Sequence, residues 1–285
     1  MADIDDHSTK SVPWSIKSNT LKGPSTTAIL AVNYNTKHLI AQLIWSIYNS
    51  LGKNGFAKLL VIDNGSVDGS KELLQVLHHN NLIELIENEQ NLYHGPALNQ
   101  GFDYLATIRG HKTEDVINAV WVLDSDCVVL RNDVLKDSTS LMNQSKAAIL
   151  GQPLADTWHA GDFGLHSLLI DPEQVWQKQI TSFEEHGEPS KHIQESCKSA
   201  NLVLQTFNFT RDGYVVHLGR STLAQIVKMN DHDNIYHDWA LTHTEPHYAG
   251  EANGVKLYRE FKTNFDAQVK EIVPSKFAGL LQDMA

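Results

Sequence analysis

Two carboxylates separated by one residue follow an apolar run near the middle of the chain. The run at 120–123 has the length of a buried strand, and Asp124 and Asp126 come directly after it. Ligands of open α/β sheets lie at the carboxyl ends of strands. Mg²⁺ and Mn²⁺ are held by carboxylates together with oxygens of a bound diphosphate. The pattern therefore predicts a site for a divalent cation and a diphosphate, against the alternative of solvated loop acids.

The elements that must position these acids can be read from hydrophobic periodicity. The run at 28–32 is continuous and apolar, as expected for a strand buried on both faces, and the mainly apolar runs at 58–62 and 82–86 also have strand length. Each is followed by an amphipathic helical pattern, clearest where Leu39 and Leu43 begin an i, i+4 series. With 120–123 as the fourth strand, this alternation predicts an α/β fold with a mostly parallel sheet flanked by helices.

Polar side chains suited to a ligand follow each expected strand. They are Asn33 and Asn35, then Asp63, then Glu87 with Asn88, and then Asp124 and Asp126. Parallel strands bring their carboxyl ends to one edge of the sheet, where nucleotides bind. The chain has neither a G-x-G-x-x-G segment after the first strand nor a P-loop, so dinucleotide and P-loop sites lack their usual signature.

The second half of the chain has a less regular pattern. Strands are expected at 147–150, 166–170 and 214–217, and helices from 171, at 195–206 and at 221–229. The polar stretch 182–194 is typical of a loop, and amphipathic segments suggest a helical C-terminal tail.

Composition excludes several classes of function. The chain has 285 residues and a net charge of −11, which argues against nucleic acid or an anionic membrane as partner. It has two cysteines, no apolar signal core at its N-terminus and no apolar run long enough for an integral membrane segment. We therefore expect a soluble, cytoplasmic protein, and the sequence leaves its oligomeric state open, a homodimer included.

Four ordered motifs carry a resemblance to a known family. They are residues 31–36 (AVNYNT), 61–70 (VIDNGSVDGS), 91–101 (NLYHGPALNQG) and 124–126 (DSD). Together they resemble a family two glycosyltransferase of the GT-A fold, closely over 26–135 and loosely over 150–222. Tyr93 stands where that family commonly has a glycine.

The resemblance implies inverting transfer of a sugar from a nucleotide-sugar to a hydroxyl acceptor. UDP is the default nucleotide, the acceptor is a saccharide or natural-product scaffold, and Mg²⁺ or Mn²⁺ is the cofactor. The implied organisation is a flexible leader (1–24), a nucleotide-sugar-binding half (25–145), an acceptor or catalytic half of the same domain (146–230) and a C-terminal extension (231–285).

The resemblance also assigns roles to individual residues. Asn33, Asn35 and Asp63 lie in segments expected to contact the base and ribose, with Asn91 and Asn99 beside the nucleotide. Asp124 would reach the ribose or the metal, Asp126 would bind the metal, and His217 would complete its shell. Simpler alternatives remain: an Asx turn for Asp63, a helix cap for Asp68 and an ordinary hydrogen bond for His217.

The catalytic acid is less clear. Attack by an acceptor hydroxyl needs a general base within about 3 Å. The family's paired acidic motif before a helix has no clean copy here. Glu195 is the first choice, with Glu184, Glu185 and Glu188 as alternatives. Glu195 could instead only favour a helix N-terminus.

Other functions and sites stay open. One alternative is a sugar-phosphate nucleotidyltransferase, although the Gly-rich loop and basic residue usual after its first strand are missing. Another is a catalytically silent nucleotide-sugar-binding protein. A second metal site is a weaker hypothesis, because Pro246 interrupts its histidines His237, His243 and His247.

Overall fold

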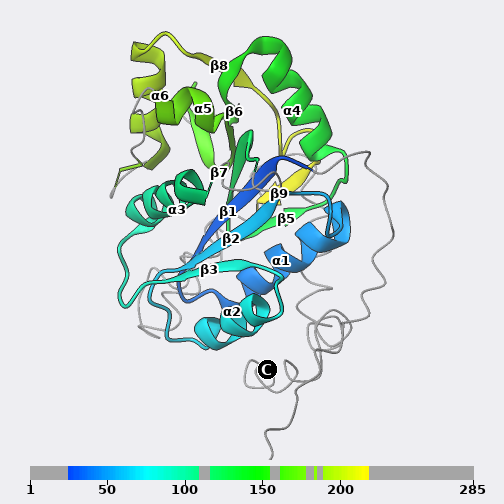
Figure 1. Ribbon diagram of the computed structural model, residues 1–285. Helices are drawn as coiled ribbons and strands as arrows, with labels where there is room; N and C mark the ends of the chain where they lie inside the picture. Colours follow the sequence, from blue (N-terminus) through cyan, green and yellow to red (C-terminus); the bar gives the residue numbers. More distant parts are fainter. Residues whose placement is uncertain (1–24, 109–115, 155–160, 178–182, 185–188, 218–285) are drawn as a thin grey trace, which may run out of the picture.

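A seven-stranded sheet forms the centre of the computed structural model, which describes residues 25–108, 116–154, 161–177, 183–184 and 189–217 (Figure 1). The strand order is β3-β2-β1-β4-β7-β6-β8. Its strands are β1 (Thr27–Asn33), β2 (Lys58–Asp63), β3 (Glu84–Glu87), β4 (Ala119–Asp124), β6 (Ala147–Pro153), β7 (Phe163–Ile170) and β8 (Val203–Thr206). A second, two-stranded sheet pairs β5 (Cys127–Val129) with β9 (Val215–His217).

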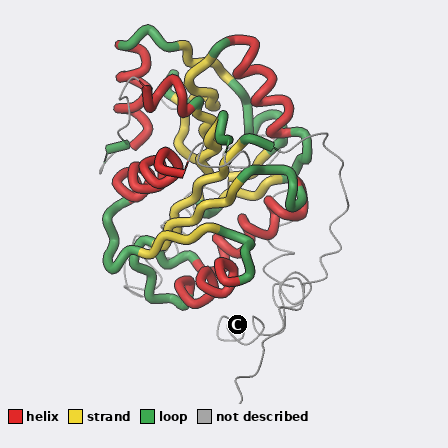
Figure 2. Tube along the Cα trace, in the orientation of Figure 1, coloured by secondary structure: helices red, strands yellow, loops and turns green. Residues whose placement is uncertain are grey.

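Helices cover both faces of the large sheet, giving three layers (Figure 2). One face packs against α1 (Lys37–Leu51), α2 (Ser70–His79) and α4 (Val134–Ser145); the other packs against α3 (His94–Ile108), α5 (Pro172–Gln177) and α6 (Pro189–Ser199). Alternation along β1 shows why both faces are apolar: Ile29 joins the first core, whereas Ala28 and Leu30 join the second.

The expected α/β class with a mostly parallel sheet is confirmed. β1, β2, β3 and β4 pair in parallel, and β7 enters antiparallel between β4 and β6. In the parallel registers Asn33 lies opposite Asp63, and Val32 lies opposite Asp124. The last residues of β1, β2 and β4 therefore share one edge of the sheet.

The second half differs from the sequence expectation around residue 200. The expected helix at 195–206 is wrong, because α6 begins at Pro189 and ends at Ser199, and β8 follows. Pro189 at the first helical position is compatible with a helix start, inside a stretch expected to be a loop. Val203 and Leu204 instead pair in parallel with β6. The helix α4 and strand β5 were not anticipated.

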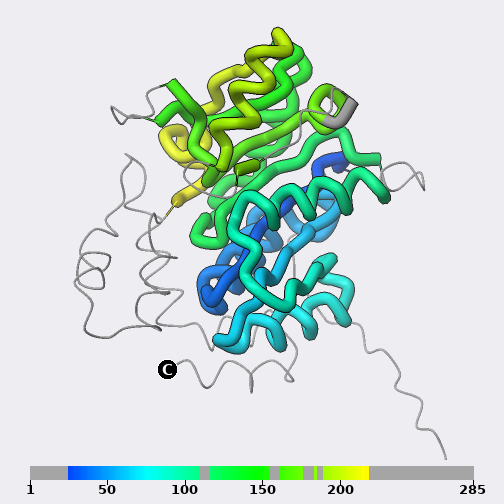
Figure 3. The backbone as a smooth tube through the Cα atoms, turned by 90° about the vertical axis from the view of Figure 1, so that its left-hand side faces the viewer, coloured from blue at the N-terminus to red at the C-terminus, as the bar shows by residue number. Residues whose placement is uncertain are grey.

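Residues from both halves of the chain build the one large sheet. Figure 3 shows the early segments of the chain, in blue to cyan, below the later segments, in green to yellow. The leader 1–24, the expected helix 221–229, the extension 231–285 and the three C-terminal histidines lie outside the described residues, so the domain limits remain a prediction. No helix in the described part of the chain is both long and apolar enough to cross a membrane.

Candidate functional site

Two acids and a histidine converge where β4 ends. β4 delivers Asp124, and Asp126 immediately precedes β5. The antiparallel β5–β9 pairing then places Cys127 opposite His217. As a result His217 Nε2 lies 3.2 Å from Asp126 Oδ1 and 3.7 Å from Asp124 Oδ2. One ligand atom from each of the three residues fits within 4.8 Å of the others.

The chemistry of this group fits a hard or borderline divalent cation. The Asp124 Oδ1 atom is buried and has no hydrogen-bond partner among the described residues. Burial raises the pKa of Asp124, and the neighbouring His94 and His217 act in the opposite direction. Two carboxylates this close together need a compensating positive charge. Two oxygens and one imidazole nitrogen are a donor set that Mg²⁺ or Mn²⁺ accepts.

A second histidine, His166 on β7, packs against the ring of His217. The two rings stack, with centroids 4.6 Å apart and planes 7° apart. Burial, followed by the nearby His217, lowers the pKa of His166 to about 3, so its ring is neutral near pH 7. A Cβ at Gly164 would lie 2.6 Å from the His166 ring, so glycine leaves room for this orientation.

A third histidine lies on the other side of the acids. His94 is the first residue of α3, and its Nε2 lies 3.7 Å from Asp124 Oδ1. Its side chain is 35% exposed, so it can be reached by a ligand. Sequence reasoning missed both His94 and His166. The signal for His94 was its place inside the motif 91–101, but no sequence signal pointed to His166.

The ends of β1 and β2, which are expected to contact the base, are joined by hydrogen bonds. Asn33 Nδ2 donates to Asp63 Oδ1 at 2.9 Å and to Ser66 Oγ at 3.1 Å. The second Asp63 oxygen accepts from the Ser66 backbone N–H at 3.1 Å, and Thr36 Oγ1 donates to Asn33 Oδ1. Asn33 and Asp63 are fully buried. The structure therefore brings them together as a prearranged pair.

The loops beside this pair are equally well fixed. Asn35 has a positive φ of 53°, and its Oδ1 accepts from the Val67 N–H at 2.8 Å. Asp68 accepts from the backbone N–H groups of Lys37 and Ser70 at 2.9 Å each. Asp68 therefore links the first residues of α1 and α2, a structural role.

Asn64 organises the loop before α3. Its Oδ1 accepts from Asn88 Nδ2 and from the Leu92 N–H, and its Nδ2 donates to Asn91 Oδ1 and the Tyr93 carbonyl. Asn91 also accepts from the Tyr93 N–H at 2.8 Å. The expected nucleotide contact of Asn91 stays a prediction, while its observed task is to shape this loop.

Tyr93 adopts a backbone conformation that favours glycine. Its φ is +66°, and its side chain is 48% exposed. The left-handed region costs a non-glycine residue about 1–2 kcal/mol. A tyrosine therefore occupies, with some strain, a backbone conformation that a glycine would adopt freely.

We expect Tyr93→Gly to stabilise the protein. Relief of strain outweighs the added flexibility of the unfolded chain, about 0.5–1 kcal/mol, so the free energy of unfolding should rise by up to about 1 kcal/mol. Urea unfolding of wild type, Tyr93→Gly and Tyr93→Ala measures this. The alanine variant removes the ring but keeps the strain, so equal stabilities for the two variants would contradict the assignment.

Asn99 lies on α3 and faces a backbone segment. Its Nδ2 donates to the Phe183 carbonyl at 2.9 Å, and its Oδ1 accepts from the Phe183 N–H at 2.8 Å. Its predicted contact with the nucleotide is untested, but both ends of its amide already have protein partners.

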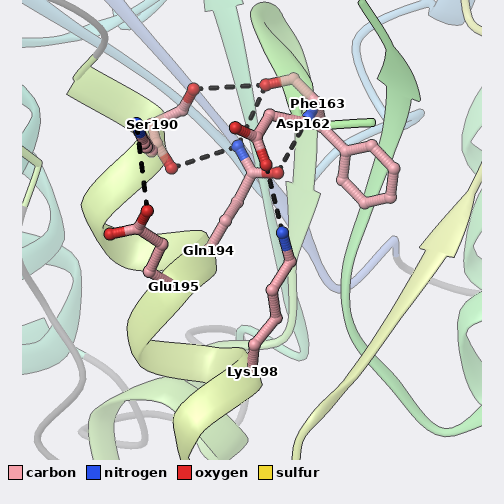
Figure 4. Close-up of polar contacts among 7 residues, drawn as sticks. Asp162, Phe163, Ser190, Gln194, Glu195 and Lys198 are labelled. Atoms are coloured by element: carbon pink, nitrogen blue, oxygen red, sulfur yellow. Dashed lines mark hydrogen bonds and ion pairs between the residues drawn. The ribbon is translucent and has the colours of Figure 1, made fainter. Parts of the chain in front are cut away.

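Glu195 is not brought together with the acids of the metal group. Figure 4 shows Gln194 directed at Phe163 and Glu195 on another side of α6. The Glu195 side chain is 58% exposed and lies 4.0 Å from Lys191 Nζ. Glu184 instead lies at the side of α3, and its carboxylate is 3.4 Å from His192 Nδ1. Glu185 and Glu188 lie outside the described residues.

Comparison with known proteins identifies the family. The model of glycosyl transferase family 2 matches residues 28–205. The chain belongs to glycosyl transferase family 2. The match confirms the resemblance to this family that the sequence indicated, and it gives no support to the nucleotidyltransferase alternative. No curated protein sequence matches the chain.

Two solved structures with TM-scores above 0.5 confirm the GT-A fold of this family 2 chain. The mannosyltransferase PcManGT from Pyrobaculum calidifontis, in complex with GDP-Man and Mn²⁺, is 15% identical with a TM-score of 0.52; the alignment covers 96% of this chain and 92% of that one. TarS from S. aureus is 14% identical with a TM-score of 0.51, covering 76% and 42%. TarS 1–349 in complex with UDP-GlcNAc is 15% identical with a TM-score of 0.49, covering 64% and 56%. The chain thus spans about half the length of these two TarS structures.

Proposed function

We propose that this glycosyltransferase transfers a sugar from a nucleotide-sugar, expected to be UDP-linked, to a hydroxyl of a saccharide or natural-product acceptor. The transfer inverts the anomeric carbon and uses Mg²⁺ or Mn²⁺. The observation that carries the proposal is the group of Asp124, Asp126 and His217, which lies at the edge of the sheet where Asn33 and Asp63 end their strands. Binding of GDP-Man and Mn²⁺ by PcManGT, a structural neighbour, agrees with this chemistry.

Different described residues along this edge of the sheet would bind different parts of the nucleotide-sugar. Asn33, Asn35 and Asp63 form the end that would receive the base and ribose, and the loop shaped by Asn64 and Asn91 flanks it. A cation held by Asp124, Asp126 and His217 would neutralise charge developing on the leaving diphosphate. His94, at the N-terminus of α3, would face the same diphosphate or the donor sugar.

The acceptor hydroxyl requires a base on the face of the sugar opposite the leaving group. Among the described acids we favour Glu184 over Glu195. Residue 184 contacts α3 at Gly95, directly after His94, whereas the Glu195 carboxylate lies beside Lys191 of its own helix α6. We further propose that residues 25–145 bind the donor and that 146–230 receive the acceptor.

Donor turnover tests the proposal. The full chain is incubated with UDP- and GDP-sugars in buffers containing Mn²⁺, Mg²⁺ or EDTA, and release of the nucleoside diphosphate is followed with and without mono- and oligosaccharide acceptors. We expect acceptor-stimulated release that requires the divalent cation. Tight nucleotide binding without release for every donor and acceptor would contradict the transferase assignment, and equal rates in EDTA would contradict metal dependence.

A further inference from the structure

One face of α3 contacts the backbone of residues 183 and 184. Gly95, Asn99 and Phe102 are spaced at i, i+4 and i+7, so they share that face. The Phe102 and Phe183 rings pack with centroids 5.5 Å apart, and both side chains are buried. The segment is therefore anchored to α3 by its ring as well as by its backbone.

Asn99 is the polar part of this anchor. The two hydrogen bonds described above satisfy both backbone groups of Phe183 with one side chain. This two-point attachment fixes the direction of the chain as well as its position, because both bonds would have to break for the peptide to turn. It also occupies the amide that sequence reasoning assigned to the nucleotide.

Gly95 brings the same helix against Glu184. A Cβ at position 95 would lie 1.8 Å from the Glu184 carbonyl oxygen and 2.6 Å from its carbonyl carbon. Only a residue without a side chain lets the backbones approach this closely. Glu184 is thus in direct contact with the first turn of α3, which also carries His94 beside Asp124.

The other side of Glu184 is held by α6. The Glu184 N–H donates to the Pro189 carbonyl at 3.2 Å, and the Glu184 carboxylate lies 3.4 Å from His192 Nδ1. Gln194 attaches α6 to β7 in the way that Asn99 attaches Phe183 to α3: its amide accepts from the Phe163 N–H at 2.8 Å and donates to the Phe163 carbonyl at 3.0 Å (Figure 4).

We propose that Asn99 is a positioning residue for sugar transfer and does not bind the nucleotide. By holding the Phe183 backbone, it keeps Glu184 against the first turn of α3, the turn that carries His94 beside Asp124. The rigid first turns of α3 set the spacing, since Asn99 and His94 are five residues, or about 7.5 Å, apart along the helix axis. The inference rests on the proposed function, because it requires that an acid at this place assists the acceptor.

The test compares Asn99→Leu and Asn99→Asp with wild type, each as the whole 285-residue chain. Leucine removes both hydrogen bonds; aspartate keeps the acceptor for the Phe183 N–H and loses the donor. Gln152→Leu is the matched control, because Gln152 is also a buried amide that accepts from backbone N–H groups, of Thr210 and Arg211, on another part of the fold. Measured quantities are kcat, KM for the donor, UDP affinity by calorimetry with Mn²⁺, and amide hydrogen exchange of peptides spanning 183–190.

We expect kcat to fall by about 10- to 100-fold in Asn99→Leu, as for a catalytic group displaced by about 1 Å, and less in Asn99→Asp. KM for the donor and UDP affinity should stay within about twofold, and exchange in 183–190 should accelerate. Gln152→Leu should leave kcat and this exchange unchanged. If Asn99→Leu weakens UDP binding at least tenfold, Asn99 is a nucleotide contact and the proposal is wrong.

Unchanged kcat in an Asn99→Leu protein with accelerated exchange would also overturn the positioning role. Equal losses of kcat in Asn99→Leu and Gln152→Leu would show that Asn99 contributes only to the general stability of the fold, which contradicts the proposal. Failure of the proposed function looks different, because wild type itself would then transfer no sugar although UDP binds and the Phe183 amide is protected. If aspartate alone yields folded protein, its kcat and UDP affinity decide by the same criteria.

Discussion

Replacing Asp126 by alanine is expected to lower metal-dependent sugar transfer by about 10³-fold or more. Asp126 is 3% exposed, and its carboxylate lies 3.2 Å from His217 Nε2 in the group that would hold the cation. A bound metal supplies several kcal/mol of transition-state stabilisation, and each 1.36 kcal/mol is a factor of ten in rate. Steady-state transfer across a range of Mn²⁺ concentrations measures the loss.

Two comparisons separate loss of the metal from loss of the fold. Mn²⁺ should raise the melting temperature of wild type, because a ligand that binds only the native state stabilises it, and it should raise that of Asp126→Ala much less. Asp103→Ala removes an exposed acid from α3 and should behave as wild type in both assays. Metal-dependent turnover of Asp126→Ala near the wild-type rate would remove this residue from the site.

Glu184→Gln is expected to have the second largest effect, a fall in kcat of about 10²- to 10⁴-fold with little change in donor affinity. Glutamine keeps the shape of the side chain but cannot accept the proton of the acceptor hydroxyl. Glu195→Gln should change kcat by less than about twofold, because in the described part of the chain its carboxylate lies 4.0 Å from Lys191 on the same helix and not beside α3.

A comparison of the candidate acids provides the control. If Glu184 is the base, kcat should collapse in Glu184→Gln and stay near the wild-type value in Glu195→Gln. Glu185→Gln and Glu188→Gln complete the series. A collapse of kcat in Glu195→Gln with normal activity in Glu184→Gln would restore the first choice made from the sequence.

Much of the fold was predictable because strands buried on both faces have simple sequences. The runs that became β1, β2 and β4 are continuous and apolar, and α1 and α3 carry a clear helical period. The region around α6 is different. Its buried face includes Ser190 and Gln194, whose polarity is compensated by hydrogen bonds to Phe163. An assignment that takes polar residues to be exposed therefore predicts a loop where this helix forms.

The candidate site was predictable where side chains follow strand ends and less so where ring or carboxylate directions matter. Asp124, Asp126 and His217 were named from motifs, and the structure brings them together. The stacking of His166 on His217 depends on the pairing of β7 with β4, more than 40 residues away in sequence, and on the space left at Gly164. Local sequence carries no sign of either condition.

The pairing of β5 with β9 also has a consequence for the order in which parts of the site form during synthesis. Its partners Cys127 and His217 are separated by about ninety residues. Closing this loop has an entropy cost, which contacts formed by the intervening elements must offset. The emerging chain can pair β1, β2, β3 and β4, and so join Asn33 to Asp63, long before His217 is available. The Asn33–Asp63 pair should thus form first during synthesis, and the group of Asp124, Asp126 and His217 should be completed last.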